Sequence, residues 1–312
     1  MMKPDLLMMG SYPDGDMEAL SSAYRLHKLW ELGPDGPAVS IRPLIRAIAT
    51  RGDLGVDTRT LEILPHLEII ACYGVGVDAI DLDMARARGI RVTNTPEVLN
   101  GDVADLAIGL ALAATRRIPA GDVHVRSGDW AKANLPLTPR LHGKKLGIAG
   151  LGRIGSTVVR RFSGFDMDIG YFGRSPHEDA PYRFFDDLTA LAAWADLLVL
   201  TLPGGAATQK IVGTEVLQAL GPEGYLVNVS RGTTVDEEAL LQALEARTIA
   251  GAGLDVFWNE PRIDPRFARL DNVVLQPHLG SATIETRLAM GQLVRDNLAA
   301  HFAGLPLLTP VI

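Results

Sequence analysis

Three glycines in residues 145–155, KLGIAGLGRIG, have the spacing of a turn that binds a dinucleotide. Gly150, Gly152 and Gly155 stand between an apolar strand pattern and a helical one. The first would allow a tight turn, the second would let backbone approach a pyrophosphate, and the third would permit close packing of helix on strand. Amides and the aligned dipole at the helix N-terminus would hold the phosphates. The pattern predicts dinucleotide binding, and the alternative is a purely structural turn.

The residues that end the next predicted strand favour NADPH over NADH. An acid about twenty residues after such a glycine turn accepts hydrogen bonds from the ribose of NAD, and it would repel a 2′-phosphate. Gly173 stands in its place, followed by Arg174 and Ser175. The guanidinium could bind a phosphate and the hydroxyl could donate to it. The alternative is a solvated arginine on a turn.

Two series of short apolar runs, separated by helical patterns, would position these residues. The predicted strands are 5–9, 45–49, 68–73 and 90–93, then 145–149, 168–172, 196–201, 225–229, 250–254 and 273–275. Helical patterns include 153–163, 236–246 and 281–302. Continuous apolar strands that alternate with helices predict parallel sheets covered on both faces. We therefore expect an α/β protein with two doubly wound parallel-sheet domains.

The chain is expected to leave its first domain and to return to it. Residues 94–96, Asn-Thr-Pro, end the first series, because the residue before proline avoids helix. Residues 100–117 form a helix that is apolar nearly all round, which predicts burial between two bodies. The last helix, with Ile284, Leu288, Leu298 and Phe302 as its apolar stripe, should pack on the first domain. The predicted domains are thus 1–97 with 283–312, and an inserted dinucleotide domain, 98–282.

Composition excludes several other classes of protein. The 312 residues are 47% hydrophobic and 21% charged, with a net charge of −7. No long run of one sign indicates a nucleic-acid partner, and no apolar run reaches the ~18 residues that span a bilayer. The only cysteine, Cys72, excludes an intrachain disulfide and fits a reducing compartment. The N-terminus lacks signal-peptide features, so we expect a cytoplasmic protein.

Several segments, in order along the chain, resemble the D-isomer-specific 2-hydroxyacid dehydrogenases. They are YGVGVDAIDL (73–82), NTPEVLNGDVADLAIGL (94–110), GLGRIG (150–155), VNVSRGTTVDEEAL (227–240), GAGLDVFWNEP (251–261) and NVVLQPHLGSAT (272–283). The chain looks most similar to the glyoxylate/hydroxypyruvate reductase and hydroxyphenylpyruvate reductase branch. The resemblance implies Rossmann- or flavodoxin-like domains with a cleft between them. It also implies a homodimer with an arm near residues 128–137, where Trp130 is a candidate for reaching the partner's active site.

The resemblance also implies three catalytic residues, Arg231, Glu260 and His278. A guanidinium can clamp the carboxylate of a 2-oxo acid and polarise the adjacent carbonyl. His278 would protonate the alkoxide that forms as hydride arrives, and Glu260 would orient its ring. The nicotinamide supplies the hydride. Taken singly, these residues could instead be a surface arginine, a turn acid and a loop histidine.

Further contacts follow from the same resemblance. The amides of Val75 and Gly76 match a segment that binds the substrate carboxylate, and Leu54 matches a substrate contact. Asp255 would accept a bond from the nicotinamide carboxamide, or it could cap a strand end. The implied cofactor contacts are Gly150, Gly152, Arg153, Ile154, Gly155, Gly173, Arg174, Ser175, Pro203, Thr208, Val229, Ser230, Asp255, His278 and Gly280. No metal site is predicted. Residues 203–208, PGGAAT, depart from the family's PLTPET, which bears on the contact by Thr208.

The predicted function is NADPH-dependent reduction of glyoxylate and hydroxypyruvate to glycolate and D-glycerate. A 3-phosphoglycerate dehydrogenase would usually bring a regulatory extension and an NAD-type acid, which this sequence lacks. Formate dehydrogenase is disfavoured because it needs no general acid. A dinucleotide-sensing corepressor shares the fold, and turnover of a 2-oxo acid separates it from an enzyme.

Overall fold

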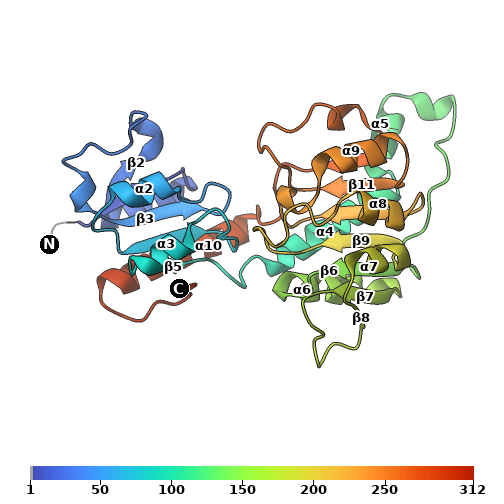
Figure 1. Ribbon diagram of the computed structural model, residues 1–312. Helices are drawn as coiled ribbons and strands as arrows, with labels where there is room; N and C mark the ends of the chain where they lie inside the picture. The colour runs from blue at the N-terminus through green and yellow to red at the C-terminus, as the bar shows by residue number, and fades with distance from the viewer. Residues whose placement is uncertain (1–2) are drawn as a thin grey trace. The chain divides into compact units, whose positions relative to one another are not determined.

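The computed structural model describes residues 3–312, and the chain divides into two compact units. The first comprises the chain up to Leu99 together with Thr283–Ile312, and the second comprises Asn100–Ala282. Each contains one fully parallel sheet with helices around it (Figure 1). The predicted fold class, two doubly wound parallel-sheet units with one inserted in the other, is confirmed.

The first unit has a five-stranded sheet in the order β2-β1-β3-β4-β5. Its strands are β1 (Asp5–Met8), β2 (Arg25–Lys28), β3 (Ile45–Arg51), β4 (Ile69–Tyr73) and β5 (Arg91–Thr93). Its helices are α1 (Asp14–Ala23), α2 (Thr58–Ile63), α3 (Leu82–Ala87) and α10 (Ile284–Phe302). One apolar core joins α2 and α3 to the sheet, whereas α10 packs on β4 and on α1.

The C-terminal residues close one edge of this sheet. Residues 309–312 run antiparallel to β5, where Thr93 pairs with Pro310. The Val311 amide donates to the Val92 carbonyl at 2.7 Å, and the Val92 amide donates back to Ile312 at 3.3 Å. An edge strand presents unpaired backbone groups, and the chain's own end satisfies these.

The second unit has a seven-stranded sheet in the order β12-β11-β10-β9-β6-β7-β8. Its strands are β6 (Lys145–Ala149), β7 (Asp168–Phe172), β8 (Arg183–Phe185), β9 (Leu197–Leu200), β10 (Tyr225–Asn228), β11 (Gly251–Leu254) and β12 (Val273–Leu275). The strand order reverses between β6 and β9. In open α/β sheets, ligands bind at such a switch point, outside the carboxyl ends of the strands.

Helices cover both faces of the second sheet. They are α4 (Asn100–Thr115), α5 (Ile118–Arg126), α6 (Arg153–Phe162), α7 (Leu188–Trp194), α8 (Thr214–Leu220) and α9 (Glu237–Glu245). One core contains α7, α8 and α9 with Ala252 and Leu254 of β11. Gly253 lies against α4 on the other face of the sheet, since a Cβ added to it would be 2.9 Å from the Cβ of Leu110. Among the described residues, no helix is both long and apolar enough to cross a bilayer.

Three details differ from the sequence-based expectations. The strands β2 and β8 were not predicted, because RLHK and RFF lack an apolar run. The predicted helix 100–117 ends at Thr115, and α5 starts at Ile118 after Arg117, whose φ is 51°. The helix was expected to be buried nearly all round, but only one face of α4 is buried in its unit, and its other residues are exposed to varying degrees.

The predicted apolar stripe of the last helix is wrong at its start. Ile284 is 78% exposed and Leu288 is 62% exposed. The face that is buried in the first unit instead carries Met290, Gly291 and Val294. This face mixes apolar residues with Thr286, Gly291 and Asn297, so apolarity alone did not locate it.

An ion pair between a buried acid and a half-buried arginine joins α1 to α10 at Gly291. Asp16 is buried, and its carboxylate accepts a hydrogen bond from Arg295. A Cβ at Gly291 would lie 2.1 Å from both Asp16 carboxylate oxygens. Glycine is therefore required here by the close approach of a charged side chain.

We predict that Gly291→Ala lowers the free energy of unfolding by roughly 1–3 kcal/mol, because the added methyl overpacks the contact with Asp16. Gly15→Ala is the matched control in the same unit, since nothing lies within 4 Å of its added Cβ. That control should be neutral or stabilising by up to about 1 kcal/mol. Urea unfolding followed by circular dichroism measures both, and equal stability of the two variants would contradict the packing argument.

Candidate active site

Most predicted site residues of the second unit follow the carboxyl ends of its strands. Gly150 follows β6 directly, Arg231 lies three residues after β10, and Asp255 follows β11 directly. His278 lies three residues after β12. Neighbouring strands are parallel, so these positions share one edge of the sheet. This is the edge at which ligands bind in open α/β sheets.

The glycine turn has the geometry expected of a phosphate-binding turn. Gly150 has a φ of 98°, which side chains disfavour, and a Cβ on Gly155 would lie 2.2 Å from the Gly150 carbonyl oxygen. The third glycine thus lets α6 pack against the turn. Gly152 caps α6, with no atom within 4 Å of an added Cβ. The exposed Arg153 and the half-buried Ile154 begin the helix. The open N-terminus of α6 could hold a dinucleotide pyrophosphate.

The tip of β7 lies beside this turn. The Gly150 amide donates to the carbonyl of Phe172, the last residue of β7, at 2.9 Å. Gly173, Arg174 and Ser175 follow immediately, and the side chains of Arg174 and Ser175 are exposed. The structure therefore places these three residues next to the turn, without an acid at the strand tip.

Glu260 and His278 are in direct contact. The Nδ1 atom of His278 lies 2.6 Å from Oε2 of Glu260, and Oε1 of Glu260 accepts the Phe257 amide at 2.8 Å. The side chain of His278 is 36% exposed and that of Glu260 is 26% exposed, so the pair is accessible to a ligand. A carboxylate at Nδ1 makes Nε2 the ring nitrogen that can exchange a proton with a substrate.

Asp255 holds the backbone on which His278 is mounted. Its buried carboxylate accepts the amide of Leu279 at 2.7 Å and the amide of Gly280 at 2.9 Å, and its carbonyl accepts the His278 amide at 2.8 Å. His278 has a φ of 54°, a conformation that residues with side chains rarely adopt. Burial raises the pKa of the Asp255 carboxyl, and the two amides oppose this. Asp255 thus fixes the loop after β12, and its contact with a nicotinamide stays a prediction.

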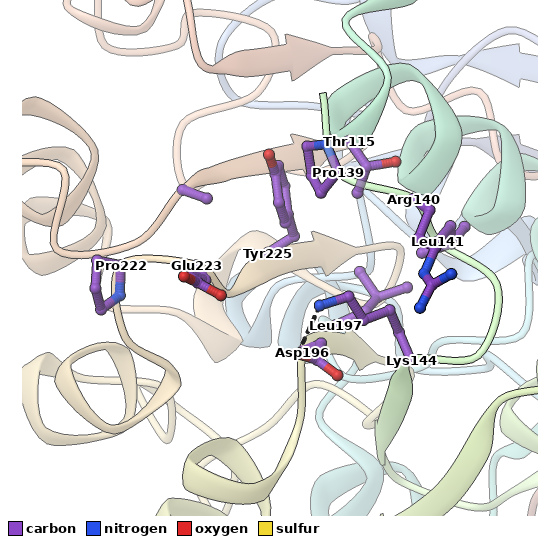
Figure 2. Close-up of a pocket in the computed structure, with 11 residues that line it drawn as sticks. Thr115, Pro139, Arg140, Leu141, Lys144, Asp196, Leu197, Pro222, Glu223 and Tyr225 are labelled. Atoms are coloured by element: carbon purple, nitrogen blue, oxygen red, sulfur yellow. Dashed lines mark hydrogen bonds and ion pairs between the residues drawn. The ribbon is translucent and has the colours of Figure 1, made fainter. Parts of the chain in front are cut away.

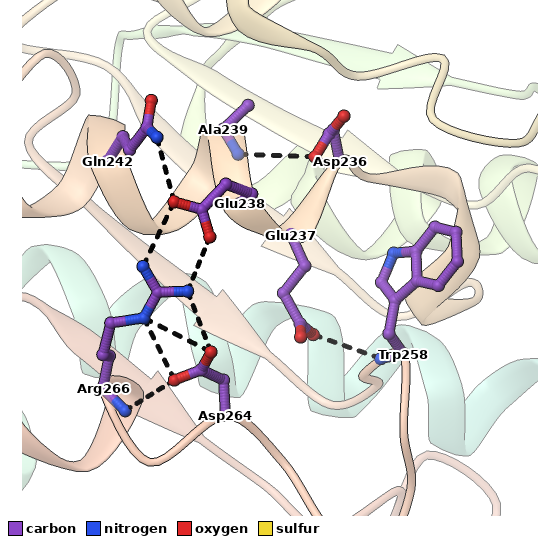
Figure 3. Close-up of polar contacts among 8 residues, drawn as sticks. All are labelled: Asp236, Glu237, Glu238, Ala239, Gln242, Trp258, Asp264 and Arg266. Carbon is purple, nitrogen blue, oxygen red and sulfur yellow. Dashed lines mark hydrogen bonds and ion pairs between the residues drawn. The ribbon is translucent and has the colours of Figure 1, made fainter.

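The segment that carries Glu260 is clamped to the start of α9, a contact that sequence reasoning missed (Figure 3). The Trp258 amide donates to Glu237 at 3.2 Å, and the Trp258 indole donates to the Val235 carbonyl at 2.7 Å. Arg266 bridges Glu238, at 2.6 Å, and Asp264, at 2.9 Å. Only the acid-rich start of the helix, DEE at 236–238, hinted at these contacts.

The turn that carries Arg231 is fixed by Asn228, which was also missed. The buried Asn228 side chain accepts the Ser230 amide at 3.0 Å and donates to the Arg231 carbonyl at 3.0 Å. A Cβ on Gly232 would lie 2.0 Å from the Phe257 carbonyl carbon, so this turn packs on the segment that leads to Glu260. The half-buried Arg231 guanidinium donates to the Ser230 carbonyl at 2.9 Å.

The remaining predicted contacts of the second unit lie in two loops. The Thr208 hydroxyl donates to the Pro203 carbonyl at 2.6 Å, so it shapes the unusual 203–208 segment. Val229 and Ser230 are buried after β10. Gly280 packs closely on Asp255, since an added Cβ would lie 3.0 Å from Oδ2.

In the first unit, the predicted substrate residues follow β3 and β4. Leu54 is exposed in the turn after β3. Val75 and Gly76 lie in the loop after β4, and the Asn94 side chain donates to the Val75 carbonyl at 2.8 Å. Thr95 makes a reciprocal pair of hydrogen bonds with Gly74, at 2.9 and 3.1 Å.

A cavity of about 350 Å³ lies at the amino ends of the strands of the second sheet, opposite the ends that carry the predicted site (Figure 2). It is lined by residues at the amino ends of β9, β10 and β11, namely Leu197, Tyr225 and Ala250, with Arg140 and Lys144. Lys144 pairs with Asp196 at 3.5 Å. This cavity is therefore distinct from the edge that carries Glu260 and His278.

Comparisons with known proteins agree with this arrangement. The model of the D-isomer-specific 2-hydroxyacid dehydrogenase NAD-binding domain matches residues 108–280. A 2-ketogluconate reductase of Gluconobacter oxydans is 46% identical over 310 residues, covering 99% of each chain.

Two solved structures are similar throughout. A 2-hydroxyacid dehydrogenase from Ketogulonicigenium vulgare has a TM-score of 0.93 and 52% identity, covering 100% of this chain and 99% of its own. An NADPH-dependent glyoxylate/hydroxypyruvate reductase from Sinorhizobium meliloti, in complex with NADP and malonate, has a TM-score of 0.93 and 41% identity. It covers 99% of this chain and 97% of its own. The chain therefore belongs to the D-isomer-specific 2-hydroxyacid dehydrogenases.

Proposed function

We propose that this protein uses NADPH to reduce small 2-oxo acids, such as glyoxylate and hydroxypyruvate, to 2-hydroxy acids. The observation that carries the proposal is the 2.6 Å contact between Glu260 and His278 at the carboxyl edge of the second sheet. A histidine oriented by a carboxylate is suited to general acid catalysis. The Sinorhizobium relative, described as an NADPH-dependent reductase of these two acids, supports the substrate class.

Each residue has a role in this reaction. NADPH, when bound, supplies the hydride. Arg231 clamps the substrate carboxylate and polarises the carbonyl, and the amides of Val75 and Gly76 bind the same carboxylate. His278 donates a proton from Nε2 to the carbonyl oxygen as negative charge develops there, while Glu260 stabilises the charged ring. Leu54 contacts the substrate.

The residues around the glycine turn fit NADPH. The amides at the N-terminus of α6 suit a pyrophosphate, and Gly173 puts neither a ribose acceptor nor a repelling charge at the tip of β7. Arg174 and Ser175 would bind the 2′-phosphate. Asp255 is proposed to contact the nicotinamide through an oxygen lone pair that its two amide bonds leave available.

The substrate has a second candidate within the same chemistry. The Gluconobacter relative is named a 2-ketogluconate reductase, and 2-ketogluconate is also a 2-oxo acid. It would engage Arg231 and His278 in the same way, with a longer chain near Leu54. A 3-phosphoglycerate dehydrogenase is a weaker candidate, because an NAD-type acid is missing at residues 173–175.

We also propose a homodimer, located in the cytoplasm. The arm that follows α4 exposes six large apolar side chains, Ile118, Val123, Val125, Trp130, Leu135 and Leu137. A concentration of such residues on one segment is typical of a protein interface, and two-fold dimers are the commonest closed assembly. The single free cysteine, Cys72, suits a reducing compartment.

For His278→Ala, we expect kcat to fall by on the order of 10² or more, because the substitution removes the proposed proton donor. The affinity for NADPH, measured by fluorescence titration, should be retained. His66→Ala, at an exposed position of the first unit, is the control. A near-normal kcat for His278→Ala would remove His278 as the proton donor.

Arg231→Lys should retain charge but lose the bidentate fork. Loss of one charged hydrogen bond costs roughly 1.5–3 kcal/mol, so kcat/KM for glyoxylate should fall about ten-fold or more. Arg262→Lys, on an exposed loop of the same unit, should leave kcat/KM unchanged. If Arg231→Lys is equally active, the guanidinium is not the clamp.

Arg174→Ala should abolish most of the preference for NADPH while leaving NADH activity nearly unchanged. A phosphate contact worth roughly 1.5–3 kcal/mol corresponds to about a ten- to hundred-fold preference in kcat/KM. Arg160→Ala, which removes an exposed charge from α6, should keep that preference. Equal kcat/KM for the two cofactors in the unmodified protein would refute the role of Arg174.

A further inference from the structure

We propose that the C-terminal segment, residues 308–312, belongs to the substrate-binding machinery. Through Asn297, Thr309 and Asn94 it positions the loop 74–76, whose amides bind the substrate carboxylate. This inference rests on the proposed function for that last step only. The structural chain that supports it lies entirely within the first unit.

Two carbonyls in the loop are pinned, and they determine where two amides point. The Gly74 carbonyl accepts the Thr95 amide at 2.9 Å, and the Val75 carbonyl accepts Nδ2 of Asn94 at 2.8 Å. In a trans peptide, the carbonyl and the next residue's N–H point in opposite directions. Pinning these carbonyls therefore orients the N–H groups of Val75 and Gly76, the two proposed to bind the carboxylate.

Asn94 is itself held by the C-terminal segment. The Thr309 hydroxyl donates to the Asn94 carbonyl at 2.6 Å, and the Asn94 amide donates to the Thr309 carbonyl at 3.4 Å. The Val311 amide continues this pairing by donating to Val92. The residue that fixes the loop therefore has its own backbone fixed on both sides.

Asn297, in the buried face of α10, anchors Thr309. Its Nδ2 donates to the Thr309 hydroxyl at 2.9 Å and to the Leu293 carbonyl at 2.8 Å. Its Oδ1 accepts the amides of Leu308 at 3.0 Å and of Thr309 at 3.2 Å. Every polar atom of this fully buried amide is used, and a fully satisfied buried network rigidifies the groups it joins.

Simple packing does not account for these residue types. An apolar side chain at 297 would fill space in α10 without the cost of desolvating an amide. The amide instead directs the Thr309 hydroxyl toward Asn94. Asn94, Asn297 and Thr309 are thus positioning residues, because they act on the loop and not on the reacting atoms.

Thr309→Val tests this chain, because it keeps the shape and removes the hydroxyl. KM for glyoxylate should rise on the order of ten-fold, with a smaller change in kcat, because carboxylate binding is weakened. The Kd for NADPH should be unchanged, since the glycine turn lies in the other unit. Thr309→Ser keeps the hydroxyl and should retain the KM of the unmodified protein. Thr58→Val, at an exposed position of the same unit, should also leave KM unaltered.

Amide hydrogen exchange of Gly74 and Thr95, which hydrogen-bond to each other beside Val75 and Gly76, gives a second readout that needs no turnover. Exchange at these two amides should be faster in Thr309→Val and in Asn94→Asp, which removes the donor to Val75, and unchanged in Thr309→Ser. Unchanged exchange at the loop in both variants, or an unchanged KM in an active enzyme, would overturn the proposal. If the unmodified protein reduces no 2-oxo acid, the proposed function fails, and the exchange rates alone decide whether the tail positions the loop.

Discussion

The proposed chemistry depends above all on the buried carboxylate of Asp255. It accepts two consecutive backbone amides, those of Leu279 and Gly280, and so stabilises a left-handed backbone conformation at His278. Without such an anchor, that conformation would be strained for a residue with a side chain. The ring then meets Glu260 at 2.6 Å. The Asp255 carboxylate thus fixes the orientation of His278, the residue we assign as proton donor.

The same physical device recurs at the other functional turns. Asn228 fixes the turn of Arg231, Glu237 fixes the backbone before Glu260, and Asn94 fixes the loop of Val75. In each case a side chain hydrogen-bonds to backbone groups in a loop after a parallel strand, where the sheet offers them no partner. Buried polar backbone must be paired, and here that requirement also sets the positions from which substrate and cofactor are proposed to be bound.

The sequence predicted features encoded within a few neighbouring residues, but not contacts between residues that lie far apart along the chain. Apolar runs located ten of the strands, and glycine spacing located the turn before α6, because each signal lies within a few residues. The polar strands β2 and β8 gave no such signal. Asn94, Asn297 and Thr309 were missed because their partners are separated by up to 215 residues. Ile284 and Leu288 were assigned to the buried face, although Gly291 and Asn297 mark it. The assignment of Glu260 and His278 needed a family resemblance, since neither residue is distinctive alone.

Steady-state turnover by the unmodified protein is the decisive measurement for the proposed reductase activity. The measurement follows reduction of glyoxylate, hydroxypyruvate, 2-ketogluconate, pyruvate and phenylpyruvate, each with NADPH and with NADH. We expect many turnovers per active site with at least one of the first three acids, and a higher kcat/KM with NADPH. Tight binding of NADPH without turnover of any of these acids would contradict it, and would indicate a dinucleotide sensor built on the same fold.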